Sequence, residues 1–198
     1  HFDAAAGLLG IKPVQRFEGQ AAMLLEGLAE QHGPADPLRN GWAIDAGHTL
    51  NLRPLLAWLA DRARHSKAAS HGVRELAPAF SGLDLRTTPD SGGLPPSSPC
   101  RGHAPEPPHQ PHAAAVFHAT LAAALCDWIR PVAEAAGIRH LVFSGGCVLN
   151  QVLTTELEQR LTGSGYRVHL PRLAPANDGG LSLGQAWIAM NVEDPARH

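Results

Sequence analysis

"LVFSGGCVLNQ", residues 141–151, is the stretch that decides the fold. Its apolar start, Leu141 to Phe143, predicts a buried strand, and the residues after Gly146 predict the beginning of a helix. In open α/β folds such a strand-to-helix turn commonly holds a ligand, because helix N-termini leave backbone N–H groups unpaired and glycines let a phosphate or sugar approach the main chain. A tight turn without a ligand has the same sequence pattern, so this stretch leaves both interpretations open.

Composition excludes several classes of protein. A chain of 198 residues with 44% hydrophobic residues can bury a core as one domain or two small lobes. The 16 basic and 18 acidic side chains give a net charge of -2, so we expect neither a nucleic-acid partner nor a membrane surface. The three cysteines are too few for a disulfide framework, and we expect a cytoplasmic protein. Because the helical pattern begins directly after His1, we also expect a piece of a longer protein.

The first 80 residues predict a helical part. Apolar residues at helical spacing, with glycine near the ends, predict three helices, over residues 2–10, 19–31 and 52–65. "GWAIDAG", residues 41–47, predicts a strand bounded by glycines. We therefore expect 1–80 to form the helical, linking part of the fold.

Residues 81–112 differ in composition from the rest of the chain. Pro, Gly, Ser and His replace nearly all large apolar residues, so the segment cannot bury enough surface to offset its ordering entropy, and a disordered insertion is predicted. It carries four potential zinc ligands with C-x2-H and H-x2-H spacing, which are Cys100, His103, His109 and His112. A plain Pro/His-rich linker is the alternative interpretation.

Residues 113–198 predict an α/β lobe. A helix over 113–137 precedes a strand–helix–strand–helix alternation with elements near 140–143, 149–161, 166–170 and 180–190. The loop after the second strand, "RLAPANDGG", places Asp178 beside two glycines at a helix start. A carboxylate there can cap the helix or reach a metal ion. Because both loops follow neighbouring strands, one is placed to hold a nucleotide and the other the cation that neutralises its phosphates.

Four segments together resemble a known family. "FSGGCVLNQVLTTELEQRL" followed by "PANDGGLSLGQA", with "FDAAAGLLG" and "FEGQAAMLLEGLA" near the start, is similar to the C-terminal half of HypF-type carbamoyltransferases, which are hydrogenase maturation proteins. The resemblance covers roughly residues 1–66 and 113–191. It implies an α/β fold, a partial actin-like ATPase (ASKHA, Kae1/TsaD-like) lobe in which a βαβα nucleotide-binding unit is joined by additional helices.

The resemblance also implies site residues. Nucleotide contacts are implied for six positions, which are Asp3, Gly19, Ser144, Gly145, Gly146 and Asn150. Asp178 matches a ligand of the catalytic divalent metal, such as Mg, Fe or Zn, and is the implied catalytic residue. Cys147 has no evident paired base, which disfavours a nucleophile there. His118 in "FHATLA" is open to two interpretations, a ligand contact or a satisfied, half-buried histidine.

The implied activity is carbamoyl transfer. Carbamoyl phosphate and ATP yield carbamoyl-adenylate, and the carbamoyl group passes to the C-terminal cysteine thiol of a partner maturation protein, becoming a cyanide ligand of the [NiFe] centre. The family's two further metal-binding histidines, spaced H-x-x-x-H, are not in this sequence. Upstream domains would therefore be needed, in cis or in trans. The alternative is a catalytically incomplete Kae1-like remnant that acts as a nucleotide- or zinc-binding docking module.

Overall fold

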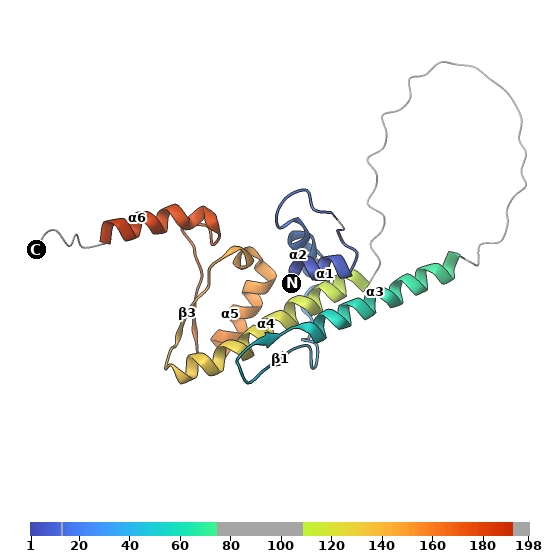
Figure 1. Ribbon diagram of the computed structural model, residues 1–198, viewed down its shortest axis with the longest axis horizontal. Coiled ribbons are helices and arrows are strands. Elements are labelled where there is room, and N and C mark those ends of the chain that lie inside the picture. The colour runs from blue at the N-terminus through green and yellow to red at the C-terminus, as the bar shows by residue number, and fades with distance from the viewer. Residues whose placement is uncertain (13, 75–108, 192–198) are drawn as a thin grey trace, which may run out of the picture.

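The computed structural model describes residues 1–12, 14–74 and 109–191 (Figure 1). Most of the predicted insertion, including Cys100 and His103, lies outside these residues. The elements, in chain order, are α1 (Phe2–Leu8), α2 (Gln20–His32), β1 (Ala43–Ile44), β2 (Leu50–Asn51), α3 (Arg53–Arg74), α4 (His109–Ala135), β3 (His140–Val142), the 3₁₀ helix η1 (Gly146–Leu149), α5 (Gln151–Gly163), β4 (Arg167–His169), the 3₁₀ helix η2 (Asp178–Gly180) and α6 (Leu181–Asn191).

Helix α4 is the centre of the fold and packs against α2, α3 and α5. Its buried face is rich in alanine, which lets neighbouring helices approach closely, and Phe117 on the same helix is fully buried. The helix has the length and hydropathy of a membrane span. However, 72% of its most apolar window is buried inside the fold, as in the core helix of a globular protein.

The start of α4 corrects one sequence-based expectation. We expected the helix to begin at Ala113, but it begins at His109, so the last four residues of the predicted disordered insertion are helical. Gln110 is only 8% exposed, and its Nε2 donates to the carbonyl oxygen of Leu9 at 2.9 Å. Pro111 lies in the first turn, where a missing N–H costs no helical hydrogen bond. The contact with Leu9 thus extends α4 into a segment of poor helical composition.

Thr120 anchors the loop between α2 and β1 on the core helix. Its buried hydroxyl donates to the carbonyl oxygen of Val116 at 2.6 Å and accepts from the N–H of Leu38 at 2.8 Å. Gly41 lies against the same side chain, and a Cβ at that position would come within 2.6 Å of Thr120 Cγ2. The position of the loop therefore depends on the Thr120 hydroxyl and on the lack of a side chain at Gly41.

The strand predicted over 41–47 is shorter than expected. Only Ala43–Ile44 is extended, and it pairs antiparallel with Leu50–Asn51, a strand that the sequence did not predict. The turn between them is closed by Asp45, whose Oδ1 accepts from the N–H groups of Gly47 and Thr49 at 2.9 and 2.8 Å. A carboxylate that bonds its own following backbone favours a tight turn over a longer strand.

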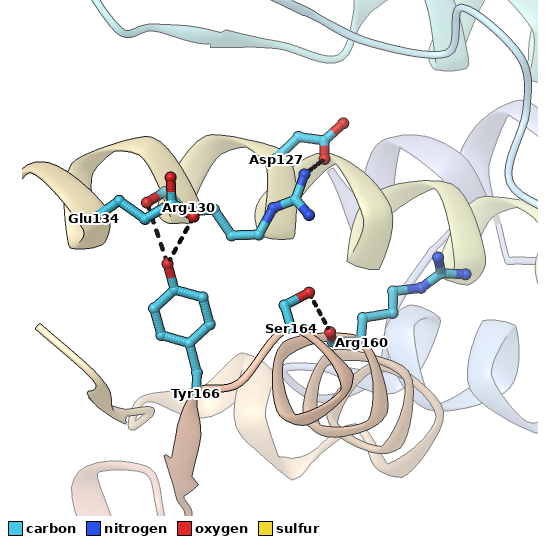
Figure 2. A network of polar contacts seen from close by, with 6 residues as sticks. All are labelled: Asp127, Arg130, Glu134, Arg160, Ser164 and Tyr166. Atoms are coloured by element: carbon cyan, nitrogen blue, oxygen red, sulfur yellow. Dashed lines mark hydrogen bonds and ion pairs between the residues drawn. The ribbon is translucent and has the colours of Figure 1, made fainter.

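The predicted strand–helix–strand unit is confirmed, but its first strand, which we expected to be buried, is not: Val142 is 77% exposed. β3 and β4 are parallel, with Leu141 opposite Val168, and α5 connects them. Figure 2 shows Tyr166, just before β4, pointing toward the end of α4, where its hydroxyl lies 3.4 Å from both the carbonyl oxygen of Arg130 and the carboxylate of Glu134. These contacts attach the strand unit to the core helix.

Helix α6 differs from the other helices because its apolar side chains are exposed. In Figure 1 it projects away from the helical core, and its principal contacts are with η2. Its large apolar residues are between 58% and 81% exposed, and they are Leu181, Leu183, Trp187, Ile188 and Met190. A helix this apolar is normally covered by another protein segment.

The Thr120 contact gives a testable prediction. Thr120→Val keeps the shape of the side chain but leaves the Leu38 N–H without its acceptor, so we expect the free energy of unfolding to fall by about 2 kcal/mol. Thr120→Ser retains the hydroxyl and loses one methyl group, so it should cost about 1 kcal/mol or less. Urea denaturation of the two variants checks this. A serine variant that is destabilised as much as the valine variant would contradict the anchoring role.

Candidate functional site

The two loops singled out from the sequence lie together. Because β3 and β4 are parallel, their carboxyl ends meet at one edge of the sheet. A backbone hydrogen bond joins the loops directly, from the N–H of Gly145 to the carbonyl oxygen of Ala176 at 2.6 Å. The Ser144–Gly146 turn and the segment that leads into Asp178 therefore form one surface, which we call the strand-end site.

The turn has free backbone donors. Gly145 has a φ of +104°, which favours glycine, and its carbonyl oxygen accepts from the N–H of Val148 at 3.0 Å. The next two N–H groups, of Gly146 and Cys147, have no acceptor among the described residues. Apart from its own turn, no part of the described chain lies within 4 Å of a Cβ built on Gly146, so a ligand can approach the main chain there. Two adjacent free N–H groups beside open space are typical of an anion site.

The N-terminus of α5, in contrast, is closed by protein groups. The Asn150 Oδ1 accepts from the N–H of Leu153 at 2.8 Å as a helix cap. From α2, the Glu26 carboxylate accepts from the N–H of Gln151. Burial raises the pKa of Glu26, partly offset by this hydrogen bond. The free donors thus belong to the turn and to η1, not to the helix that the sequence pattern indicated.

Asn150 is buried, and both the oxygen and the nitrogen of its side-chain amide are hydrogen-bonded within the protein. It is 7% exposed, and its Nδ2 lies 3.1 Å from Nε2 of His118, a residue with no exposed surface. The other ring nitrogen, Nδ1, lies 2.8 Å from the carbonyl oxygen of Ala114 and must donate to it. Nε2 is therefore the acceptor for Asn150, and burial lowers the pKa of His118, which favours this neutral form.

Asp178 is free for a ligand, because its neighbour does the capping. The Asn177 Oδ1 accepts from the N–H of Gly179 at 3.2 Å, at the start of η2. Gly180 is required by close approach, since a Cβ there would lie 2.5 Å from the Pro175 carbonyl oxygen. The Asp178 side chain is exposed, and no described residue forms a hydrogen bond or ion pair with it. Of the two roles that the sequence left open, the cap belongs to Asn177.

The other predicted nucleotide contacts lie on the helical part. Asp3 is exposed in the first turn of α1, and the ring of its neighbour Phe2 packs edge-on against His118 with centroids 5.6 Å apart. Gly19 precedes α2 with a φ of +79°. It lies about 10 Å along that helix from Glu26, by the rise per residue. Phe2 and Glu26, on the same two helices, contact His118 and Gln151 near the start of α5.

The alternative zinc set is only partly described. His109 and His112 lie one turn apart on α4, and His112 Nδ1 lies 3.2 Å from Nε2 of His32 on α2. Burial and neighbouring positive groups lower the pKa of His112, among them Arg62. Within residues 1–12, 14–74 and 109–191, no three His, Cys, Asp or Glu side chains are grouped to hold a metal.

The two described cysteines have different environments. Cys147 is exposed in the turn, whereas Cys126 is buried and its pKa is raised by burial to about 11. Cys126 is therefore protonated and unreactive at neutral pH.

The sequence did not lead us to the capping roles of Glu26 and Asn177, and it left the role of His118 open between a ligand contact and a buried structural histidine. Glu26 lies mid-helix in α2, where an acid normally faces solvent, and nothing in the pattern indicates that it caps a helix 125 residues further along. Asn177 did carry a signal, because Asn before a helix start is a common cap. The bond between His118 and Asn150 joins two helices and has no local sequence signal.

Comparison with known proteins agrees with this architecture. A family model described as "Carbamoyltransferase, Kae1-like Domain, second subdomain" matches residues 1–82 and 103–185. The chain is 35% identical over 215 residues to carbamoyltransferase HypF2 of Cupriavidus necator, covering 96% of this chain and 21% of that protein. It is 37% identical over 191 residues to carbamoyltransferase HypF of Rhizobium leguminosarum bv. viciae, covering 96% of this chain and 19% of the relative.

Solved structures show the same similarity. The fold matches a crystal structure of full-length HypF in the phosphate- and nucleotide-bound form, with a TM-score of 0.63 and 26% identity, over 98% of this chain and 20% of that one. Crystalline T.kodakarensis HypF shares the fold with a TM-score of 0.53 at 16% identity, over 94% of this chain and 19% of that one. The chain thus spans about a fifth of the length of these relatives. From its matching family model, its identity to curated relatives and its fold, the chain belongs to the HypF carbamoyltransferase family, as the second subdomain of the Kae1-like domain.

Proposed function

We propose that this chain supplies the nucleotide-phosphate and metal side of a carbamoyltransferase. In the whole protein, a carbamoyl group from carbamoyl-adenylate, made from carbamoyl phosphate and ATP, passes to the C-terminal cysteine thiol of a hydrogenase maturation partner in the cytoplasm. The observation that supports this is the hydrogen bond from Gly145 to Ala176. This hydrogen bond supports the proposal because it joins the turn that carries the free backbone donors to the loop that leads into Asp178.

The chemistry of these groups fits a nucleotide phosphate. The N–H groups of Gly146 and Cys147 are donors for phosphate oxygens, and open space beside Gly146 gives them access. The Asp178 carboxylate is an oxygen ligand of the kind that divalent cations bind, and such a cation stabilises charge on a leaving phosphate. In this proposal the turn positions the nucleotide while Asp178 contributes one ligand to the metal. Ser144, exposed beside the turn, is a further hydroxyl within this surface.

A single carboxylate does not hold a divalent cation well, so the remaining ligands must come from another part of the protein. The exposed apolar face of α6 and the two-stranded sheet of β3 and β4 supply a docking surface for that part. Because the matching family model covers a second subdomain, we assign this surface to the first subdomain of the same Kae1-like domain. Residues Asp3 and Gly19 on the helical part would then face the nucleoside.

The role proposed for Asp178 is tested by Asp178→Asn in the full-length protein. The change keeps the size of an exposed side chain and leaves the Asn177 cap intact, so thermal stability should not change. Carbamoyl transfer to the partner thiol should fall about a hundredfold or more, because charge stabilisation of this kind is worth several kcal/mol.

A matched control is Asp61→Asn, which removes one exposed acid from α3, far along the chain from the strand-end site. It should leave carbamoyl transfer unchanged. Full activity in the Asp178→Asn protein would refute the metal role. In that case the chain would be better explained as a docking module that binds nucleotide, or zinc, without catalysis.

The two glycines of the turn should respond differently to alanine. Gly145 has a φ of +104°, so Gly145→Ala should cost about 1–2 kcal/mol of stability and also weaken ATP binding. Gly146 has ordinary backbone angles and open space around it, so Gly146→Ala should melt at the wild-type temperature yet bind ATP about tenfold more weakly. Calorimetry and ATP titration separate the two effects. Wild-type ATP affinity in Gly146→Ala would place the phosphate elsewhere.

A further inference from the structure

His118 is a buried titratable group whose surroundings are fixed on every side. It has no exposed surface, and its Nδ1–H donates to the carbonyl oxygen of Ala114 on the same helix. The rings of Phe2 and Phe117 pack edge-on against it, with centroids 5.6 and 5.4 Å away. Its remaining polar atom, Nε2, lies 3.1 Å from Nδ2 of Asn150. The imidazole is therefore held in one tautomer and one orientation, with its acceptor pointed at the start of α5.

Asn150 connects His118 to the strand-end site through further hydrogen bonds. Its Oδ1 caps α5 through the N–H of Leu153, and its own backbone N–H donates to the carbonyl oxygen of Cys147 at 3.2 Å. Cys147 belongs to η1, whose first N–H groups are the free donors of the turn. A change in the orientation of Asn150 thus alters the geometry of the phosphate-binding turn within three residues.

We propose that His118 is a positioning residue for nucleotide binding: as the neutral acceptor for Asn150, it holds the turn from Gly146 to Leu149 in its phosphate-binding geometry. This inference rests on the proposed function of the strand-end site. His118 does not touch the nucleotide, since it is fully buried. It acts through Asn150 and η1.

If His118 holds the turn in this way, the affinity for nucleotide should fall at acid pH. A protonated Nε2 is a donor and would face the Asn150 NH2 group, which is also a donor. Reversing the amide would restore that hydrogen bond, but it would turn the NH2 group toward the Leu153 N–H and destroy the cap. Burial lowers the pKa of His118 below its ordinary value of 6.5. Nε2 is therefore neutral in the folded protein at pH 6.5 and above, and the hydrogen bond to Asn150 is lost as the pH falls through the lowered folded-state pKa.

Other titratable groups near this contact need to be distinguished from His118. From α2, Glu26 accepts a hydrogen bond from Gln151, next to Asn150, and burial raises the pKa of Glu26 above 4.5. From α1, Asp3 follows Phe2, whose ring contacts His118. Glu26→Gln removes the titration of Glu26 while keeping the acceptor oxygen.

Variants of His118 in the full-length protein test the proposal. His118→Gln places an amide oxygen near the position of Nε2 and does not titrate, whereas His118→Leu has no acceptor. His140→Gln, at an exposed position on β3, is the matched control. Two quantities are measured from about pH 5 to pH 8: ATP affinity, and amide hydrogen exchange of residues 144–153 without nucleotide.

We expect His118→Leu to weaken ATP binding about tenfold at neutral pH and to speed exchange in residues 144–153. His118→Gln and Glu26→Gln should keep most of the wild-type affinity at neutral pH, and only His118→Gln should lose the acid-side decline. Equal losses in His118→Gln and His118→Leu, or wild-type affinity in His118→Leu, would overturn the positioning role. If the wild-type protein binds no ATP, the proposed function fails, and the exchange of residues 144–153 still decides whether His118 positions the turn.

Discussion

The hydrogen bond between Asn150 and His118 connects the two halves of this fold. His118 lies on α4, the buried helix against which α2, α3 and α5 pack, and Asn150 caps α5 directly after η1. Because both side chains are buried, leaving either one unsatisfied would be costly, so the turn is placed relative to the core with little freedom. Together with the contacts of Glu26 and Tyr166, this bond fixes the start of α5 and the turn before it against the helical core.

Local patterns in the sequence predicted the strand–helix–strand unit and the position of both loops. β3, α5 and β4 follow from apolar runs separated by glycine, and parallel pairing follows from their order. The cap that Asn177 provides is a local contact with a recognisable sequence signal, whereas the capping of α5 by Glu26 depends on a contact that no local pattern encodes. The early start of α4 has the same cause, since Gln110 is held by Leu9, about a hundred residues away in the chain.

The surface of the chain agrees with a subdomain that works as part of a larger unit. The buried apolar residues lie mostly in the helical core, whereas α6 buries none, and Trp187 on α6 and Val142 on β3 are exposed. The strand-end site opens from the sheet that carries this uncovered surface, and its carboxylate needs further ligands to hold a cation. In the function that we propose, one docked subdomain would cover the apolar surface and also supply the further metal ligands.

The nucleotide role of the strand-end site is tested most directly by the footprint of ATP on the full-length protein, measured by amide hydrogen exchange with and without nucleotide. If the strand-end site holds the nucleotide, protection should be greatest in residues 144–149 and in the loop that carries Asp178, with smaller changes at the start of α1. Protection centred instead on the open groove between α2 and α5, which is lined by Ala29, Glu30, Val152 and Gln159, would contradict it. So would an unchanged exchange rate at Gly146 and Cys147, the two residues whose free N–H groups define the site.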